Sequence, residues 1–230
     1  MIRAILFDLD GTLLDSAPDL VATLNWLRLK NNLPELPFSE MRNCAGRGAV
    51  GLLKAGMPEV NPETLESWRL EFLDRYQQSS LERSGLFEGV RDLLGELDRC
   101  HLPWGIVTNK PEYLTIPIVE AFGLSASLGC LVCGDTLEKR KPHPAPLLLA
   151  CEQLGVEPMN TLYVGDDVRD LQAGHAAHTE VCAALYGYGY EELARPEHFE
   201  LLQNAIRIQH PNELTGYLEL TPGVPGPILR

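Results

Sequence analysis

The sequence predicts an α/β protein with a parallel sheet and an inserted helical segment. From about residue 85 onward, short apolar runs alternate with amphipathic helical patterns, which is typical of parallel strands joined by right-handed crossovers. An apolar run at residues 2–7 supplies one further strand of the same kind. Residues 17–84 between them show helical spacing and no convincing strand. A chain of 230 residues is long enough for such a core and a small insertion.

Composition excludes several classes of partner. The hydrophobic fraction of 45% is ordinary for a globular protein, and the formal net charge is −13. Such a surface repels phosphate backbones and anionic lipid, so we expect no nucleic-acid or membrane partner. We see neither a run of 18 apolar residues nor an apolar signal-peptide core, and we therefore expect a cytoplasmic protein. A monomer and a homodimer both remain open.

The six cysteines do not form a recognisable framework. They are scattered along the chain, and the single CxxC at Cys130 and Cys133 lacks the second pair that a zinc site would need. We expect buried, reduced thiols.

The elements follow in order from these patterns. After the first strand, the helical patterns of the insertion have their apolar positions at near-helical spacing and are separated by prolines. We place a core domain at residues 1–16 and 85–230 and the helical insertion at residues 17–84. The last ten residues, rich in proline and glycine, are expected to be extended or disordered. The expected strands are residues 2–7, 103–107, 130–133, 161–164 and 180–185, and the expected helices are 17–31, 41–54, 64–81, 89–99, 111–122, 144–154 and 171–177, with a weaker strand and helix in 198–220.

Polar residues follow several of the expected strands. In a parallel sheet, the carboxyl ends of the strands lie along one edge, where ligands bind. The predicted site therefore collects side chains that are far apart in the sequence. They are Asp8 and Asp10 after the first strand, Thr108 and Asn109 after the second, and Asp166 and Asp167 after a later strand, with Lys141 expected to begin the helix before it.

The residue types indicate phosphoryl transfer. Asp8, Asp10 and Asp166 in one crevice repel one another unless a cation is present, and hard oxygen ligands suit Mg²⁺. Asp8 can attack phosphorus, and Asp10 can move protons. The remaining groups would hold the phosphate: Lys141 by charge, Thr108 and Asn109 by hydrogen bonds, and Gly11 by letting the backbone approach closely.

Each of these features alone has an ordinary structural interpretation. An Asp-x-Asp at a strand end is common as a turn or helix cap, Thr108-Asn109 could simply begin a helix, and most lysines lie on the surface. The joint occurrence of these residues in this order favours a site.

Four motifs resemble those of the haloacid dehalogenase superfamily of phosphatases. They are the DLDGT stretch from Asp8 to Thr12, Thr108 in IVTNK, Lys141 in KPHPAP, and the acidic GDDVRD stretch from Gly165 to Asp170. The resemblance covers nearly the whole chain and implies a Rossmann-like core with an α-helical cap.

Within the superfamily, the sequence is similar to the phosphoglycolate phosphatase branch. FDLDGTLLDSAPDL, TNKP, KPHPAPLLLAC and the late YGYGY carry this similarity, and LEFLDRYQ and VGDDVRDLQAG also resemble a phosphatase of N-acetylmuramic acid 6-phosphate. The resemblance implies hydrolysis of a small phosphate monoester, most simply 2-phosphoglycolate, with N-acetylmuramic acid 6-phosphate as the alternative.

The resemblance also implies individual roles. Asp8 would be the nucleophile and a metal ligand, Asp10 the acid/base and a ligand through its backbone carbonyl, and Asp166 the third Mg²⁺ ligand. Arg47, in the glycine-rich AGRGAVG, would bind a substrate carboxylate or else be an ordinary exposed arginine. Asp167 and Asp170 could contact the metal or be structural. The chain departs from the family where Ala177-His178-Thr179 replaces a frequent glycine, and we expect the change to affect the loop alone.

Two other functions remain open. A sugar-phosphate mutase would keep both Asp8 and Asp10. A phospho-receiver domain also uses aspartate, threonine, lysine and Mg²⁺, but its acid pair comes first in the chain, whereas here the pair at Asp166 and Asp167 comes late. Dehalogenases need no acid at position 10, because a halide leaving group needs no proton.

Overall fold

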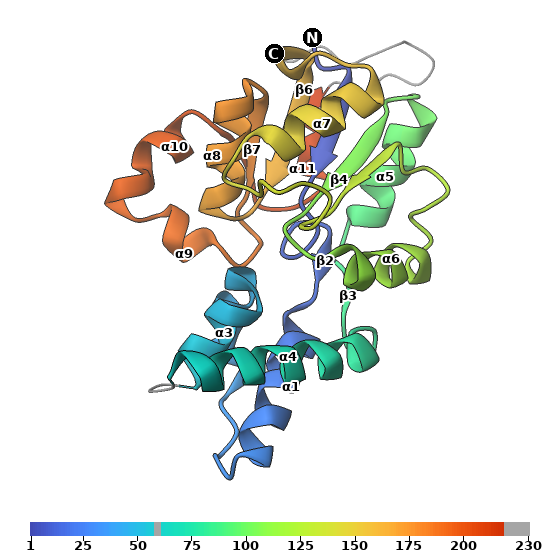
Figure 1. Ribbon diagram of the computed structural model, residues 1–230. Coiled ribbons are helices and arrows are strands. Elements are labelled where there is room, and N and C mark those ends of the chain that lie inside the picture. Colours follow the sequence, from blue (N-terminus) through green and yellow to red (C-terminus); the bar gives the residue numbers. More distant parts are fainter. Residues whose placement is uncertain (58–60, 219–230) are drawn as a thin grey trace. The chain divides into compact units, whose positions relative to one another are not determined.

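The centre of the computed structural model is a six-stranded parallel sheet, and the structure describes residues 1–57 and 61–218 (Figure 1). The strand order is β5-β4-β1-β6-β7-β8, so the N-terminal strand lies in the middle. The predicted parallel α/β fold is confirmed. The strands are β1 (Ala4–Phe7), β4 (Trp104–Val107), β5 (Cys130–Val132), β6 (Thr161–Gly165), β7 (Glu180–Ala184) and β8 (Ile206–Ile208).

Alternate side chains of the central strand enter two different cores. Ile5 and Phe7 pack into one hydrophobic cluster, and Leu6 between them packs into another. This alternation is the period of two that a strand imposes, and it explains why a strand covered on both faces is apolar throughout.

The helices in residues 86–218 are α5 (Val90–Arg99), α6 (Glu112–Ala121), α7 (Ala145–Leu154), α8 (Val168–Ala177), α9 (Tyr190–Leu193), α10 (Phe199–Gln203) and α11 (Glu213–Leu218), with short 3₁₀ turns at Pro158–Asn160 and Pro196–His198.

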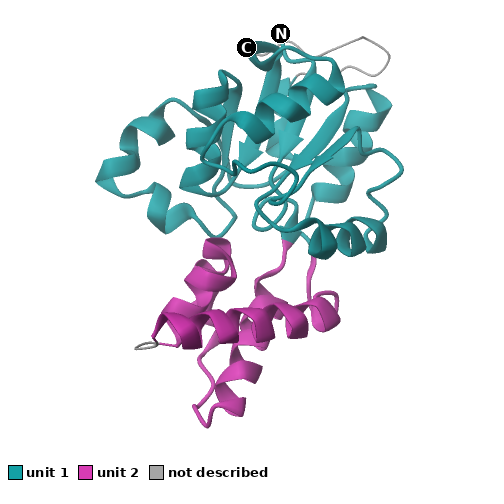
Figure 2. Cartoon of the chain, viewed as in Figure 1, with its two compact units in different colours: residues 1–14, 86–230 teal, residues 15–85 magenta. Residues whose placement is uncertain are grey.

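Contacts divide the chain into two compact units (Figure 2). One comprises residues 1–14 and 86–230 and holds the sheet; the other, the helical unit, comprises residues 15–85. Two short strands that the sequence did not predict, β2 (Leu14–Asp15) and β3 (Gly85–Leu86), pair with each other where the chain passes between the units. Two-residue strands are too short to produce a recognisable hydrophobic pattern.

The helical unit has its own core, to which α1 (Ala17–Lys30), α3 (Gly48–Gly56) and α4 (Pro62–Ser79) contribute. Leu24 and Leu27 of α1 are fully buried, as are Leu52 of α3 and Phe72 of α4. Asn61 caps α4, because its side chain accepts a hydrogen bond from the backbone of Thr64 at 2.8 Å. The elements are α1 (Ala17–Lys30), α2 (Phe38–Met41), a 3₁₀ helix at Arg42–Arg47, α3 (Gly48–Gly56) and α4 (Pro62–Ser79).

Asp19 joins the beginning and the end of the helical unit. Its buried carboxylate accepts hydrogen bonds from the backbone N–H groups of Arg83 and Ser84 and from the Ser84 hydroxyl, at 3.1, 2.8 and 2.6 Å. Such charge-assisted bonds fix the first turn of α1 against the last residues of the segment.

Some details differ from the expectations. The pattern at residues 41–54 is two helices, because Gly48 adopts a φ of +69° and separates them. Lys141 does not begin a helix: α7 begins four residues later, and Lys141 lies in the preceding loop. The expected extended end at residues 221–230 lies outside the described residues. No helix in the described part of the chain is long and apolar enough to cross a membrane.

Candidate active site

Three adjacent strands end at one place and bring the predicted residues together. Phe7 at the end of β1 is in register with Ile106 of β4 and with Val164 of β6. The residues that follow these strands therefore lie side by side, as the rule for parallel sheets predicts. They include Asp8, Thr108 and Asp166, whose exposures are 9%, 4% and 1%.

Lys141 is the cation at the centre of this group. Its Nζ donates hydrogen bonds to Asp170 Oδ1 at 2.7 Å, the Tyr163 hydroxyl at 2.8 Å and the Val107 carbonyl at 2.9 Å. These three bonds use all three ammonium hydrogens. Lys141 Nζ also lies 2.9 Å from Asp8 Oδ1, and this fourth contact is therefore ionic.

Burial and crowding change the acidity of the group. Burial raises the pKa of Asp8 to about 6, with Lys141 opposing the shift and Asp170 and Asp10 adding to it. Burial also raises the pKa of Asp166 well above its usual value, and the charges of Asp170 and Asp8 add to that shift. Lys141 alone does not balance the charges of the buried carboxylates of Asp8, Asp166 and Asp170, so the site favours a further cation.

The carboxylates offer a suitable donor set for that cation. Asp8, Asp166 and Asp170 each place a possible ligand atom within 4.8 Å of the others. Asp170 is bound to Lys141, whereas the hydrogen-bond partners of Asp166 are neutral groups: the Thr12 hydroxyl at 3.2 Å and the backbone N–H groups of Tyr188 and Gly189. Anionic oxygen donors fit a hard ion such as Mg²⁺.

A tight turn follows Asp8. Gly11 has a φ of +88°, and its N–H donates to the Leu14 carbonyl at 2.9 Å. A Cβ at Gly11 would also lie 2.4 Å from an oxygen of Asp166. Both the left-handed conformation and this close approach require glycine.

Asp10 does not join the carboxylate cluster through its side chain. Its two oxygens lie 3.0 and 3.1 Å from Nζ of Lys110, which follows β4. Lys110 was not predicted as a site residue, although it lies two residues after Thr108. This lysine is only 8% exposed and holds the Asp10 carboxylate at the strand ends.

Asn109 lies at the site, and its amide contacts the backbone of Lys141. The side chain donates to the Lys141 carbonyl at 2.9 Å and accepts from the Lys141 N–H at 3.1 Å. Asn109 therefore fixes the loop that carries Lys141, and its second amide hydrogen is not used by these two bonds. The predicted phosphate contact stays a prediction. Thr108, in turn, accepts a hydrogen bond from the Lys110 N–H at 3.2 Å through its hydroxyl, which stays able to donate.

Comparison with known proteins agrees with this geometry. The family model described as haloacid dehalogenase-like hydrolase matches residues 5–184, which include the ends of β1, β4 and β6. The chain belongs to the haloacid dehalogenase-like hydrolase family.

Individual relatives of this hydrolase carry two names. The chain is 39% identical to an N-acetylmuramic acid 6-phosphate phosphatase of Pseudomonas aeruginosa over 95% of each chain. It is 43% identical to a phosphoglycolate phosphatase of Xanthomonas campestris pv. campestris, over 81% of this chain and 84% of the relative. A crystal structure from Haemophilus somnus, titled as a predicted phosphoglycolate phosphatase, superposes with a TM-score of 0.81 at 28% identity, covering 94% of this chain and 97% of that one.

The two further acids of the hydrolase have structural partners. Asp167 caps α8, since its side chain accepts from the Arg169 N–H at 2.9 Å and pairs with the Arg169 guanidinium at 2.7 Å. Asp170 completes the capping box by accepting from the Asp167 N–H at 3.0 Å. Asp170 also accepts from the hydroxyl of Tyr163, a second residue that the sequence analysis missed.

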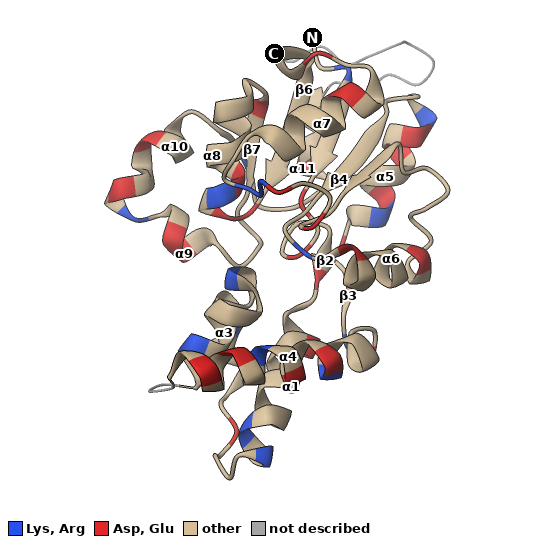
Figure 3. Cartoon of the chain, in the orientation of Figure 1, with Lys and Arg blue, Asp and Glu red and all other residues tan. Residues whose placement is uncertain are grey.

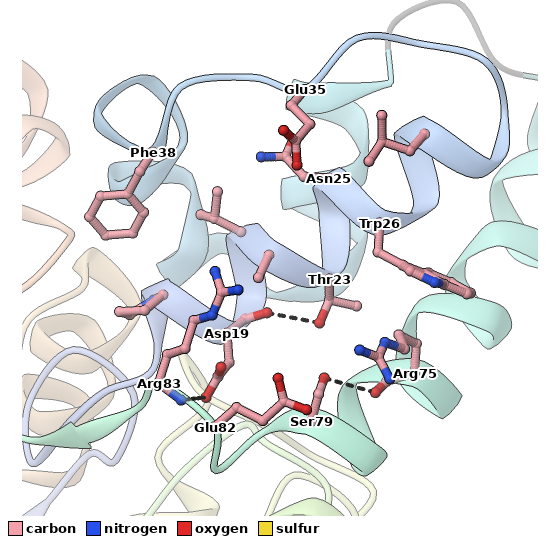
Figure 4. Close-up of a pocket in the computed structure, with 14 residues that line it drawn as sticks. Asp19, Thr23, Asn25, Trp26, Glu35, Phe38, Arg75, Ser79, Glu82 and Arg83 are labelled. Atoms are coloured by element: carbon pink, nitrogen blue, oxygen red, sulfur yellow. Dashed lines mark hydrogen bonds between the residues drawn. The ribbon is translucent and has the colours of Figure 1, made fainter.

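The helical unit of the hydrolase holds Arg47 and a separate cavity. Arg47 is exposed and ends the 3₁₀ helix. The cavity has a volume of about 440 Å³ and lies between α1 and the end of α4 (Figure 4). Trp26, Arg75 and Arg83 line it, and none of the predicted site residues does. Acidic residues are found on helices of both units (Figure 3).

Proposed function

We propose that this hydrolase is a Mg²⁺-dependent phosphatase of small phosphate monoesters that works through an aspartyl-phosphate intermediate. The buried group of Asp8, Lys141 and Asp166 is the observation that supports it, because it combines a nucleophile with charges of both signs. Asp8 and Asp166, together with the Asp10 carbonyl, would hold the ion. Bound Mg²⁺ would offset the negative charge of the phosphate and the carboxylates.

The residues of the chain then divide the chemistry between them. An oxygen of Asp8 attacks phosphorus, and the bond from phosphorus to the ester oxygen breaks. Asp10 gives its proton to that leaving oxygen and later takes one from the water that hydrolyses the aspartyl phosphate. Lys141 keeps Asp8 in place, and the Thr108 hydroxyl donates to a phosphate oxygen.

We propose a substrate that carries a carboxylate in addition to its phosphate. Both 2-phosphoglycolate, our first choice, and N-acetylmuramic acid 6-phosphate have this chemistry, and phosphatases named for each are among the relatives. Arg47 is the proposed partner of the carboxylate. The cytoplasmic location and the oligomeric state stay predictions.

A turnover panel tests this proposal. It contains 2-phosphoglycolate, N-acetylmuramic acid 6-phosphate, N-acetylglucosamine 6-phosphate and hexose phosphates, each with Mg²⁺ and with a chelator. We expect release of free phosphate that needs Mg²⁺ and is lost in Asp8→Asn. The N-acetylglucosamine ester lacks the lactyl group that carries the carboxylate of the muramic ester, so equal kcat/KM for the two amino-sugar esters would refute carboxylate recognition. Isomerised product without free phosphate would refute the phosphatase.

A further inference from the structure

A loop of alternating tyrosine and glycine, residues 186–190, follows β7 and lies against Asp166. We call it the YGYGY loop. The N–H groups of Tyr188 and Gly189 both donate to Asp166 Oδ2, at 2.8 and 3.2 Å. The backbone of the loop therefore fixes one oxygen of a carboxylate that we propose as a metal ligand.

The two glycines of the loop are required by this contact. A Cβ at Gly187 would lie 2.3 Å from the Cβ of Asp166 and 2.4 Å from the Gly11 carbonyl. A Cβ at Gly189 would lie 2.1 Å from the backbone oxygen of Asp166. Real Cβ contacts are longer, so any larger residue would push the loop away from Asp166.

Tyr186 of the loop is connected to the second oxygen of Asp166 through Thr12. The Thr12 hydroxyl donates to Asp166 Oδ1 at 3.2 Å, and the Thr12 carbonyl accepts a hydrogen bond from the Tyr186 hydroxyl at 2.9 Å. Thr12 is fully buried. Tyr186 thus fixes the residue that orients the other half of the carboxylate.

Aromatic packing holds the tyrosine ring itself. The ring of Phe87 lies edge-on to that of Tyr186, with 5.1 Å between centroids, and tilted to that of Tyr188 at 6.3 Å. The Phe87 N–H donates to the Leu13 carbonyl at 3.0 Å. Edge-to-face pairs of this kind restrict ring motion. The Tyr186 hydroxyl is therefore presented in a fixed direction.

We propose that Tyr186 is a positioning residue for the metal site, acting through Thr12 on Asp166. The inference rests on the proposed function, because it takes Asp166 to be a Mg²⁺ ligand. Partners that orient a metal ligand typically change metal affinity or activity by ~10–100-fold when removed. Tyr186 acts one bond further from the ligand than Thr12, so its removal has the smaller effect.

The test measures Mg²⁺ binding by thermal shift on the full chain, with no substrate present. The variants are Tyr186→Phe, Thr12→Val, Thr12→Ser and the double variant of Tyr186→Phe with Thr12→Val. Tyr190→Phe is the control, since Tyr190 is the last residue of the same YGYGY stretch, begins α9 and is half exposed. We expect the half-saturating Mg²⁺ concentration to rise ~3–10-fold in Tyr186→Phe and ~10-fold or more in Thr12→Val, and to stay unchanged in the control.

Coupling distinguishes positioning from mere stabilisation. If Tyr186 acts through Thr12, then adding Tyr186→Phe to Thr12→Val changes the Mg²⁺ dependence by less than ~2-fold, because coupled residues are not additive. Thr12→Ser keeps the hydroxyl and restores binding. A lower melting temperature for Tyr186→Phe with an unchanged Mg²⁺ dependence would overturn the proposal, and so would full additivity.

Two further outcomes are decisive. Should Tyr186→Phe not fold, unchanged Mg²⁺ binding in Thr12→Val would overturn the proposal by itself. Wild-type protein without any Mg²⁺-dependent shift would overturn both the metal assignment and the proposal, whereas its phosphate release reports separately on the proposed function.

Discussion

The ammonium of Lys110 lies within 3.1 Å of both oxygens of the Asp10 carboxylate, across a sequence separation of 100 residues. The position of the Asp10 side chain is therefore fixed by Lys110, which follows β4, and not only by the turn after β1. Lys110 is nearly buried, which makes the pair stronger than an exposed ion pair. The contact fixes the carboxylate that we propose as the acid/base.

Lys110→Met should lower kcat by at least ~10-fold, because general acid–base catalysis is worth ~10²–10⁴-fold and needs a positioned carboxylate. KM should change much less, since Lys110 has no proposed contact with substrate. Steady-state kinetics with p-nitrophenyl phosphate measure both. Lys139→Met, which removes an exposed lysine, serves as the control. A kcat equal to that of the control would show that the pair is not needed.

Asp10→Asn should slow both the protonation of the leaving oxygen and the breakdown of the aspartyl phosphate. Asparagine has the same shape but cannot transfer this proton. With p-nitrophenyl phosphate, whose leaving group needs little protonation, only the breakdown step should be slowed, and rapid-quench measurements should then show phosphorylated Asp8 accumulating. The assigned role is wrong if the turnover rate stays within ~3-fold of wild type, a barrier change under ~0.7 kcal/mol.

The stability of the metal-free protein should depend on Asp8. Its pKa in the folded protein is raised to about 6, above the ~3.9 of an unfolded chain, because burial disfavours the charged form. Ionised Asp8 therefore lowers the free energy of unfolding. This loss is absent below about pH 4, grows between about pH 4 and 6 and reaches its full size above that range.

Asp8→Asn removes this loss. In a chelator, its free energy of unfolding should exceed that of wild type by roughly 2–3 kcal/mol at pH 7.5 and by almost nothing at pH 4. Denaturant unfolding at the two pH values measures the difference. Asp92→Asn, at an exposed acid of α5, should show no such change with pH. A gain of equal size at both pH values would contradict the explanation.

Arg47→Ala should raise KM for carboxylate-bearing phosphates by ~10-fold, equivalent to about 1.4 kcal/mol, through loss of a charge-assisted pair. The KM for p-nitrophenyl phosphate, which lacks a carboxylate, should not change. Lys54→Ala removes a neighbouring exposed cation of α3 and is the control for general charge effects. Equal losses on both kinds of substrate would remove Arg47 from carboxylate recognition.

His178→Gly should stabilise the protein by about 1 kcal/mol. His178 follows α8 with a φ of +59°, the left-handed conformation that costs a residue with a Cβ about 1–2 kcal/mol. Glycine adopts this conformation without that cost. Thermal or denaturant unfolding measures the effect. His175→Gly, inside α8, should instead destabilise by about 1 kcal/mol, and stabilisation by both variants would point to another cause.

The elements that the sequence predicted are those with a local cause. The run before Asp8 is apolar because β1 is covered on both faces, and Asp8, Thr108 and Asp166 could be placed together because parallel strands end at one edge. The contacts that went unpredicted have no local pattern. Lys110 reaches Asp10 only after the sheet has formed.

Two residues show why roles are harder to predict than positions. Asn109 was placed at the site correctly, but its amide is used by the backbone of Lys141, a partner 32 residues away. Tyr163 lies inside an ordinary apolar strand, and its hydroxyl finds Asp170 only through the packing of α8 on the sheet. Neither relation has a signature in the neighbouring residues.

The pairing of β2 with β3 has a consequence for how such enzymes diversify. The two ends of the segment 15–85 lie in the paired strands β2 and β3 and are therefore close together. Another segment with two neighbouring ends could replace it without disturbing the residues that follow β1, β4 and β6. A chimera that exchanges residues 15–85 between relatives would therefore show whether substrate selectivity is carried by this segment.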